Sequence, residues 1–507
     1  MVDEEDNQRP SASSRLAGIP YQWVAMTVVL LGTFMVVLDT TIVNLGLPSL
    51  QEDFDAVHGV EWVVTAYLIA VGVTQLASGW AGDRFGRRRA FIFAIVVFTA
   101  ASLLCAVSPT LWLLVIARVL QGVGGGLLMP VGMAMIYELF DPDERGRALG
   151  IFGIAVMAAP AIGPVLGGTL VSSIGWRWLF LINLPVGLVA IPVAIRFLRD
   201  TGYREERPLD RGGLAVAAAG LVALLIGLQQ GGSWGWTSPG IIALLTTGGV
   251  LVTAFTIHSL RVPAPLVDMR IFGHPVFAIS MLAIALMTVA QYCRLVYIPL
   301  ELGATRGVDE LKIGLVMLPS AIGVAMMMPI GGRLADRVGS RLPFTVGAAI
   351  LFVSYIPLTN LTADTDLWKI ALILLLGGFG TGLAVMAPNV VAMNAVTAAQ
   401  VGQASGLSQV SRQVSAALGT AVLASIFVSA APPSGIADPS SIDAAISAYD
   451  TVFTAALVAL AGSVVVGLVL PGRRRALALQ AERSAEREQM LAAGTVRGDD
   501  RPTAVEH

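Results

Sequence analysis

Long apolar runs separated by short charged clusters constrain this chain more than any other feature of its sequence. The first run spans residues 23–47, and comparable runs recur as far as residue 471. An apolar run of about 18 or more residues predicts a helix that crosses a membrane. Lipid offers the backbone no hydrogen-bond partners, so runs of this length are expected to form helices. The sequence therefore predicts an all-α polytopic membrane protein.

The composition excludes several other classes of protein. Only 13% of the 507 residues are charged, whereas a soluble domain has about 25%. The formal net charge of −2 leaves no basic surface for nucleic acid. Two cysteines, Cys105 and Cys293, are too few for a disulfide framework or a cysteine-based metal site. No nucleophile–base pair or metal motif is evident, so we expect no enzyme, metal or cofactor.

Fourteen predicted spans divide the chain into two bundles and an insertion. The expected organisation is a tail at 1–20, a six-helix bundle at 21–200, two inserted helices at 201–262, a second six-helix bundle at 263–471, and a tail at 472–507. The spans are 23–47, 60–79, 90–108, 110–136, 148–172, 177–197, 212–230, 240–260, 275–299, 311–331, 343–361, 368–391, 407–430 and 451–471.

The basic residues predict the orientation of these helices. If the N-terminus is inside, 25 of the 32 Lys and Arg fall in inner segments and four in outer loops. Such an excess of basic residues is typical of cytoplasmic loops. An even number of spans then places both termini in the cytoplasm, in a protein of the cell membrane.

An internal repeat relates the two bundles. The segment GWAGDRFGRR at 79–88 recurs as GRLADRVGSR at 332–341, in each case after the second helix of a bundle. Aligning the two copies pairs the first six helices with the last six and leaves the two helices between them as an insertion. Internal repeats are typical of secondary transporters, whose sites lie at the repeat interface.

These motifs carry a family resemblance. The loop motif at 79–88 resembles the signature of the major facilitator superfamily, and other segments resemble its 14-helix drug:proton antiporters. The resemblance covers about 20–471, although Ala159 replaces a usual glycine and Ser340 a usual basic residue. It rests on LDTTIVN at 38–44, Arg118 with Gln121 and Gly122, Gly163-Pro164 with Gly167 and Gly168, WRW at 176–178 followed by Asn183, PLVD at 265–268, and Arg412-Gln413.

Asp39 and Arg118 are the candidate proton-coupling residues. Asp39 is the only carboxylate that lies well inside a predicted span, and such residues are costly and usually functional. Burial disfavours its charged form and a nearby cation favours it, so a balanced site could bind and release a proton. The resemblance implies that Arg118 takes part in proton transfer. A structural hydrogen bond and an interhelix tie are the respective alternatives, and the sequence leaves contact between the two residues open.

The two loop motifs are predicted to form a cytoplasmic latch that stabilises the outward-open state. Glycine permits close helix approach and tight turns, and Asp83 could accept from a neighbouring helix N-terminus. The alternative is that the basic residues only set topology. The latch residues are Gly79, Asp83, Arg84, Gly86, Arg87, Arg88, Gly332, Asp336, Arg337, Gly339 and Arg341.

Two further groups of residues are candidates with weaker support. The fifth helix is expected to pack closely and bend through its small residues and proline, and only the resemblance links that motif to antiport: Gly150, Gly163, Pro164, Gly167 and Gly168. Polar residues that either line a substrate cavity or make ordinary interhelical bonds are Asn44, Tyr67, Gln75, Gln121, Arg294 and Asn389. Arg294 either contacts an anionic or amphipathic substrate or forms a local salt bridge with Glu301.

The expected function is export of amphipathic, drug-like compounds across the cytoplasmic membrane by proton antiport, with alternating access. A dedicated exporter of an endogenous metabolite or lipid is the alternative with the same fold. A non-transporting membrane sensor is a more distant alternative. The expected partners are a small-molecule substrate, protons and the lipid bilayer, without nucleic acid, and we expect a monomer.

Overall fold

The computed structural model describes residues 20–56, 59–141, 144–199, 208–362, 364–397, 400–430, 442–472 and 478. The predicted tails lie almost wholly outside these residues. Within them the regular structure is helical, and its elements are α1 (Tyr21–Ile42), η2 (Val43–Gly46), α2 (Leu47–Asp53), α3 (Trp62–Phe85), α4 (Arg87–Ala106), α5 (Leu111–Leu139), α6 (Arg145–Ile174), α7 (Trp178–Leu181), α8 (Asn183–Phe197), α9 (Arg211–Trp234), α10 (Pro239–Arg261), η3 (Met269–Gly273), α11 (Pro275–Arg306), α12 (Glu310–Val338), α13 (Arg341–Tyr355), η4 (Pro357–Asn360), α14 (Leu367–Ala384), α15 (Met386–Asn394), α16 (Val401–Ala430) and α17 (Ile442–Val469).

The described helices match the predicted spans in number. Thirteen helical segments are long and apolar enough to cross a membrane. The 30-residue helix α6 occupies the remaining predicted span, at 148–172. The largest shift in a boundary concerns α17, which begins at Ile442, nine residues before the predicted start. Helices α11 and α12 end at Arg306 and Val338, each seven residues beyond the predicted end.

The two loop motifs end their helices in the same way. Gly86 follows α3 and Gly339 follows α12, and both have a φ angle of 84°. A side chain is strained in this backbone region, whereas glycine adopts it freely. Each glycine therefore stops one helix and lets the next begin at once. The end of the bundle that holds Gly86 and Gly339 is called the motif end below.

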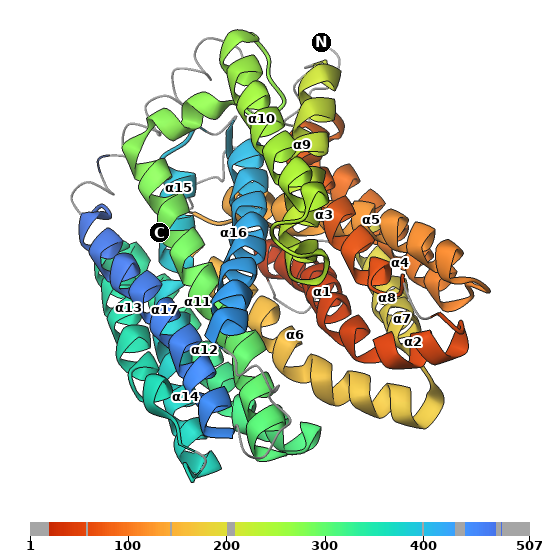
Figure 1. Cartoon of the computed structure of the whole chain (residues 1–507). Coiled ribbons are helices and arrows are strands. Elements are labelled where there is room, and N and C mark those ends of the chain that lie inside the picture. Colours follow the sequence, from red (N-terminus) through yellow and green to blue (C-terminus); the bar gives the residue numbers. More distant parts are fainter. Residues whose placement is uncertain are drawn as a thin grey trace, which may run out of the picture.

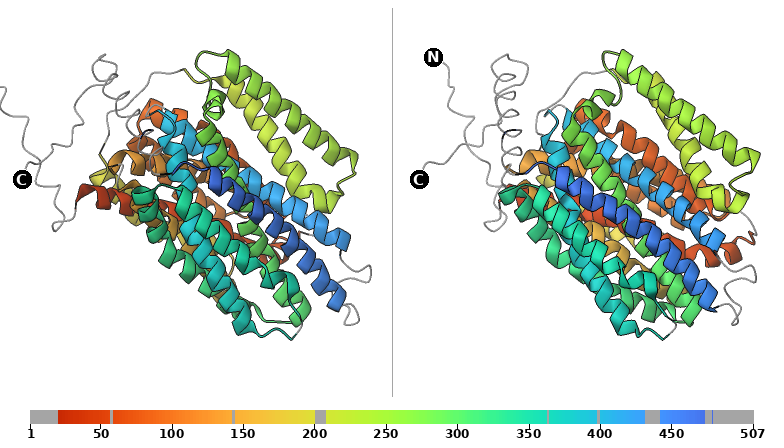
Figure 2. Two further views of the ribbon diagram at one scale, coloured as in Figure 1. Left: turned by 90° about the vertical axis from the view of Figure 1, so that its left-hand side faces the viewer. Right: turned by 60° about the vertical axis from the view of Figure 1, so that its left-hand side comes forward.

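The helices form two groups that meet along two seams (Figure 1). Helix α3 packs against α16 in one seam, and α6 packs against α12 in the other. The inserted pair α9–α10 stands at one side of the bundle, as both views of Figure 2 show. Helix α9 contacts both α3 and α16, whereas α10 packs mainly on α9. The insertion thus lies across one of the two seams.

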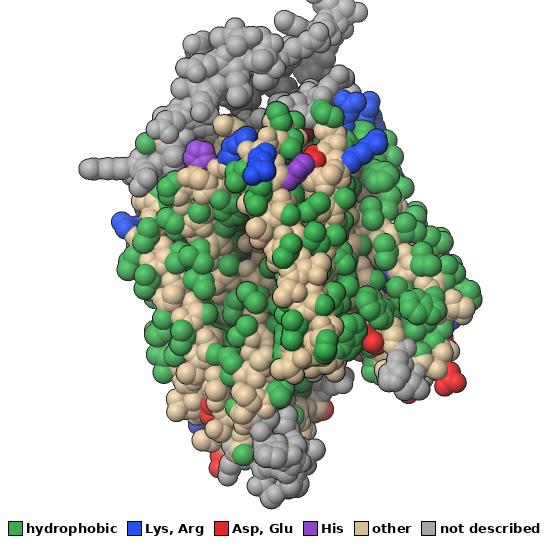
Figure 3. Space-filling model, turned by 45° about the horizontal axis from the view of Figure 1, so that its top comes forward, with side chains coloured by type: hydrophobic (Ala, Val, Ile, Leu, Met, Phe, Trp, Pro, Cys, Tyr) green, Lys and Arg blue, Asp and Glu red, His purple; other side chains and the backbone are tan. Residues whose placement is uncertain are grey.

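The surface has the polarity of a membrane protein. Hydrophobic side chains cover the middle of the face shown in Figure 3, whereas Lys, Arg and His side chains lie in a band near the motif end. Large exposed apolar residues are frequent on outward faces, for example Val250 on α10 and Val458 on α17. Lipid-facing helices are expected to expose such residues because the acyl chains are as apolar as the side chains.

Candidate functional site

Asp39 and Arg118 form a buried ion pair. Arg118 Nη1 donates to Asp39 Oδ2 over 2.6 Å, and the two side chains are 1% and 0% exposed. Asp39 comes from the last turn of α1, and Arg118 from the first half of α5. Removing one partner of such a pair leaves a buried charge without compensation, which costs about 3–5 kcal/mol. The contact that the sequence left open is therefore present.

Two further polar side chains, supported by a third, complete the coordination of the Asp39 carboxylate. Gln121 Nε2 donates to Asp39 Oδ1 over 2.9 Å, and Asn183 Nδ2 donates to the same oxygen over 3.0 Å. Gln121 Nε2 also donates to Ser102 Oγ over 2.8 Å. These residues come from α5, α8 and α4. The carboxylate thus accepts from donors on two helices, α5 and α8, and Ser102 of α4 accepts from one of them.

Arg118 has other partners besides Asp39. Its Nε donates to the Val63 carbonyl over 2.9 Å, and its Nη1 also reaches Gln121 Oε1 over 2.6 Å. The Tyr67 ring lies 3.9 Å from the guanidinium carbon, which is a cation–π distance. The guanidinium keeps its charge at any relevant pH. These contacts would still hold it if Asp39 were protonated.

The sequence located part of this site and missed the rest. Tyr67 and Gln121 were candidates for a substrate cavity, and the structure places both in the Asp39 cluster. Ser102 was not singled out because a serine in an apolar helix usually bonds to its own backbone. Asn183 was noted in the resemblance, after the WRW segment, and as a plausible polar residue of a cavity. The available signal in the sequence was a polar residue within each of several apolar segments, which could have indicated a shared polar cluster.

The glycines of the two loop motifs allow the halves to approach closely. A Cβ atom at Gly79 would lie 2.7 Å from the backbone nitrogen of Gln403, at the start of α16. A Cβ atom at Gly332 would overlap the carbonyl oxygen of Gly146, at the start of α6. Gly79 and Gly332 therefore each meet the first turn of a helix in the opposite half. A larger side chain at either position would push the seam apart.

The other latch residues differ in their surroundings. Asp83 is buried beside Gly402, where a Cβ atom would lie 3.3 Å from its Oδ1. Arg87 pairs with Glu138 over 2.7 Å and stays within its own half, as does Arg88, which donates to the Ile195 carbonyl over 2.7 Å. Arg84 and Arg337 are exposed, and Arg341 donates to the Leu468 carbonyl. The Asp336 side chain lies outside the described residues.

Polar bonds also cross between the halves. Ser405 Oγ donates to the Pro130 carbonyl over 3.0 Å, and Tyr137 Oη donates to the Val390 carbonyl over 2.9 Å. Gln413 Nε2 donates to the Leu68 carbonyl over 2.5 Å. Each acceptor is a backbone carbonyl within a membrane helix. The closed seam is thus stabilised by specific contacts as well as by packing.

The glycines of α6 serve two different neighbours. Gly150 packs against the backbone of α12, where a Cβ atom would lie 2.8 Å from the Met328 carbonyl oxygen. Gly163 and Gly167 pack against the end of α1, at Thr41 and Ile42. Nothing lies within 4 Å of a Cβ atom at Gly168, and the side chain of Pro164 is outside the described residues. Helix α6 therefore connects the neighbourhood of Asp39 with the opposite half.

The remaining cavity candidates do not join the Asp39 cluster. Gln75 is buried where Gly406 packs on its carbonyl oxygen, and Asn389 Oδ1 accepts from Ser408 Oγ over 3.1 Å. Asn44 is exposed and donates to the Thr40 carbonyl of α1. These positions are separated along η2, α3 and α15.

The predicted alternative of a salt bridge between Arg294 and Glu301 is wrong. Glu301 pairs with Arg306, whose Nε lies 2.9 Å from Glu301 Oε1. The reason is that α11 continues through both residues, so Arg306 emerges near Glu301 in the last turn. Glu301 is therefore also a carboxylate buried within a helix, so Asp39 is not the only one.

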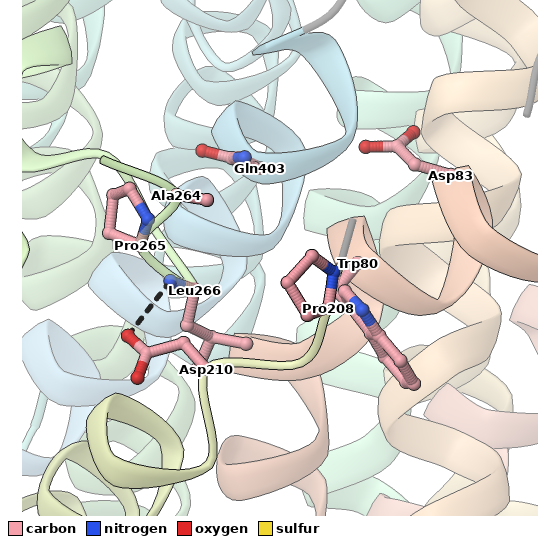
Figure 4. Close-up of a pocket in the computed structure, with 8 residues that line it drawn as sticks. All are labelled: Trp80, Asp83, Pro208, Asp210, Ala264, Pro265, Leu266 and Gln403. Atoms are coloured by element: carbon pink, nitrogen blue, oxygen red, sulfur yellow. Dashed lines mark hydrogen bonds between the residues drawn. The ribbon is translucent and has the colours of Figure 1, made fainter. Parts of the chain in front are cut away.

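A tether connects the inserted helices to the seam between α3 and α16. Asp210 caps α9 by accepting from Gly213 N over 2.7 Å, and it also contacts His258 Nε2 over 3.1 Å and Leu266 N over 3.3 Å. The segment between α10 and α11, which contains Leu266, also reaches α16, where Asp268 N donates to Gln403 Oε1 over 3.0 Å. A small pocket there, shown in Figure 4, is lined by Trp80, Asp83, Pro208, Asp210, Ala264, Pro265, Leu266 and Gln403.

Asp210→Ala is expected to destabilise the protein more than Asp309→Ala, which removes a comparable helix cap without tertiary contacts. Loss of a cap costs about 1 kcal/mol, and leaving the other donors unpaired adds roughly 1–3 kcal/mol. Burial alone raises the pKa of Asp210, but the hydrogen bonds from Gly213, His258 and Leu266 outweigh it, so the pKa lies below its ordinary 3.8.

This carboxylate therefore stabilises the fold at pH values above 3.8 and loses its effect as the pH falls through the lower folded-state pKa. Thermal unfolding in detergent at neutral pH measures the difference between the two alanine variants. Equal losses of Tm for both variants would contradict the prediction that the tertiary contacts of Asp210 stabilise the protein.

Comparison with known proteins identifies the family. A family model described as the major facilitator superfamily matches residues 29–420. The chain belongs to the major facilitator superfamily. It is 33% identical over 402 residues to a multidrug resistance protein B homolog of Mycobacterium tuberculosis, a match that covers 78% of this chain and 74% of the relative. It is 30% identical over 429 residues to the tetracenomycin C resistance and export protein of Streptomyces glaucescens, covering 84% and 79%.

A solved structure confirms the superfamily fold. The crystal structure of the human organic anion transporter MFSD10 (TETRAN) superposes with a TM-score of 0.59 at 17% identity, covering 87% of this chain and all of the other. At this identity the likeness concerns the fold alone. Together with the thirteen apolar helices, membership of the superfamily makes this chain a multi-pass membrane transporter of small molecules rather than an enzyme.

Proposed function

We propose that this protein exports amphipathic, drug-like compounds across the cytoplasmic membrane in exchange for protons. The observation that carries the proposal is the sealed Asp39–Arg118 pair, a carboxylate and a guanidinium inside a transporter of this superfamily. Two relatives named for multidrug resistance and for antibiotic export support the choice of substrate class.

The proton step follows from the contacts of the pair. In this conformation Asp39 is fully buried and accepts hydrogen bonds from three donors. A proton competes with Arg118 for that carboxylate once water reaches it. Arg118 then keeps the Val63 carbonyl, Gln121 Oε1 and the Tyr67 ring as partners. Asp39 can therefore alternate between two neutralised states, one with the guanidinium and one with a proton.

The conformational step is assigned to the seams. In the proposed outward-facing state, the motif end is cytoplasmic and closed by the contacts of Gly79 with α16 and of Gly332 with α6. Helix α6 touches α1 at Thr41, two residues from Asp39, and touches α12 at Met328. A change of protonation that moves the end of α1 would therefore be transmitted to the seam between the halves. This coupling makes the latch release depend on the proton site.

Everted vesicles test the proposal directly. Fluorescent cationic, neutral and anionic compounds are offered with a proton gradient and again after the gradient has been collapsed by an uncoupler. We expect gradient-dependent uptake of several amphipathic compounds into vesicles that contain the protein and background uptake without it. Uptake that persists unchanged after the gradient collapses would refute proton coupling.

A dedicated exporter of one endogenous metabolite or lipid is the second candidate, and the resemblance to a tetracenomycin exporter favours a natural product as its cargo. The same panel distinguishes the two candidates. A response confined to one natural product would favour the dedicated exporter, whereas no gradient-driven transport of any compound would favour the sensor.

A further inference from the structure

Arg294 is a buried arginine without a charged partner among the residues that the structure describes. It lies in the middle of α11 and is only 7% exposed. Its Nη1 is buried and has no hydrogen-bond partner among the described residues, and the carboxylate of Glu301 is engaged by Arg306. A guanidinium stays charged, and inside a membrane protein it needs an anion, carbonyl groups or water.

Arg294, Ser354 and Gly377 come together from three helices, α11, α13 and α14. A Cβ atom at Gly377 on α14 would lie 2.9 Å from Arg294 Nη1 and 3.0 Å from Ser354 Oγ on α13. The guanidinium and the hydroxyl therefore both pack closely on Gly377, and Ser354 Oγ donates to the Leu351 carbonyl over 2.7 Å. The nearby Tyr355 hydroxyl donates to the Ala290 carbonyl and adds no negative charge.

In the internal repeat, this cluster lies at nearly the same positions of its helices as the Asp39 site does in the first half. Asp39 is the nineteenth residue of α1 and Arg294 the twentieth of α11, counted from Tyr21 and Pro275. Gln121 and Gly377 are each the eleventh residue of their helices, α5 and α14. Ser102 follows Gly86 by sixteen residues and Ser354 follows Gly339 by fifteen. The second half thus repeats the site with a cation in place of the carboxylate and a glycine in place of the glutamine.

The two halves differ in how the buried charge is balanced. In the first half, Asp39 neutralises Arg118 over 2.6 Å. In the second half, no described side chain neutralises Arg294, and the position that corresponds to Gln121 is Gly377. The charge imbalance and the missing side chain occur at the same place. The charge imbalance is accounted for if a ligand supplies the negative charge.

We propose that Arg294 and Ser354 bind a monovalent anion in the second half of the transporter. The ligand is either the carboxylate of an exported compound or a free inorganic anion such as chloride. The guanidinium provides charge and two parallel donors, which suit a carboxylate. The Ser354 hydroxyl donates to either ligand once it turns away from the Leu351 carbonyl. The carboxylate alternative rests on the proposed export function, whereas binding itself does not.

Ligand-dependent stability of the purified protein tests the site. Sodium chloride and sodium benzoate are titrated separately against the wild type and Arg294→Gln in detergent, with the Tm as the readout. A ligand that binds the folded state raises the Tm as its concentration exceeds Kd. We expect at least one salt to raise the Tm of the wild type by about 2 °C or more above its effect on Arg294→Gln, which reports the general effect of salt.

A built-in counterion provides a second, independent test. In Gly377→Asp, a carboxylate is placed beside Arg294 Nη1, so we expect a higher basal Tm than in Gly377→Asn and a loss of the anion response. Gly377→Asn has the same size and controls for steric effects. Arg412→Gln controls for charge, because Arg412 is also buried in part and lacks a hydrogen-bond partner at its Nε, but it lies on α16. It is expected to keep the anion response.

The outcomes separate the two possible ligands and the two proposals. A response to chloride alone indicates an inorganic anion, whereas a response to benzoate, together with Arg294-dependent uptake of benzoate by everted vesicles, indicates the substrate. If neither salt acts on the wild type, or if Arg294→Gln responds equally, the anion site is refuted. Gradient-driven export of cationic compounds by the same wild-type protein would then leave the proposed function intact.

Discussion

Asp39→Asn is expected to reduce proton-driven efflux to the background of vesicles that lack the protein. Asparagine has nearly the shape of aspartate and can still accept from Gln121 or Asn183, but it cannot carry a proton. The substitution also leaves Arg118 buried without its counterion, so we expect a loss of stability of about 3–5 kcal/mol. Efflux in everted vesicles and thermal unfolding of the purified protein measure the two effects separately.

The double variant Asp39→Asn with Arg118→Gln separates proton carriage from stability. Removing both charges also removes the uncompensated cation, so most of the lost Tm should be regained, whereas transport should stay at background. A double variant that regained gradient-driven efflux would show that the pair is structural. Normal efflux by Asp39→Asn alone would exclude Asp39 as the proton carrier.

Gly332→Val is expected to hold the motif end open. A Cβ atom at this position would overlap the carbonyl oxygen of Gly146, and backbone cannot move aside as a flexible side chain can. Overpacking of this kind costs about 1–3 kcal/mol, which corresponds to a shift of about 5- to 150-fold in an equilibrium between two states. We therefore expect loss of transport together with increased exposure of the seam, without unfolding.

Maleimide labelling of Ser405→Cys measures that exposure, because Ser405 is buried in the closed seam and contacts Pro130 of the other half. The labelling rate should rise in the Gly332→Val background. Gly249→Val is the matched control, since Gly249 lies in α10 with nothing within 4 Å of a Cβ atom. An unchanged labelling rate in Gly332→Val would contradict the role of this glycine in closing the seam.

Local sequence information predicted the helices well because the hydropathy of a segment acts on that segment alone. It predicted less about their ends and partners. The predicted ninth helix ended at 299, yet α11 continues to Arg306 because Glu301 and Arg306 neutralise each other inside it. A carboxylate looks like the end of an apolar run when its partner is unknown. The prediction of Arg294 as its partner failed for the same reason.

The proton site also shows what local sequence information can and cannot predict. Asp39 and Arg118 were singled out because each is a charge in an apolar segment, which is costly wherever the segment lies. Their contact spans 79 positions of the sequence, and Ser102 joins through Gln121 from another helix. Which face of a helix turns inward depends on how it packs, and a mid-helix serine gives little indication of that in the sequence.

The sequence by itself determined the class of protein, the number of helices, their repeat and the two charges most worth testing, because each of these depends on the cost of placing polar groups in lipid. Only the tertiary structure decided that Asp39 is buried inside one half, and that Gly79 and Gly332 each meet the start of a helix in the opposite half. It alone also decided that Arg294 lacks a counterion among the described residues. Those facts depend on distances between segments that are remote in the chain, and packing alone sets such distances.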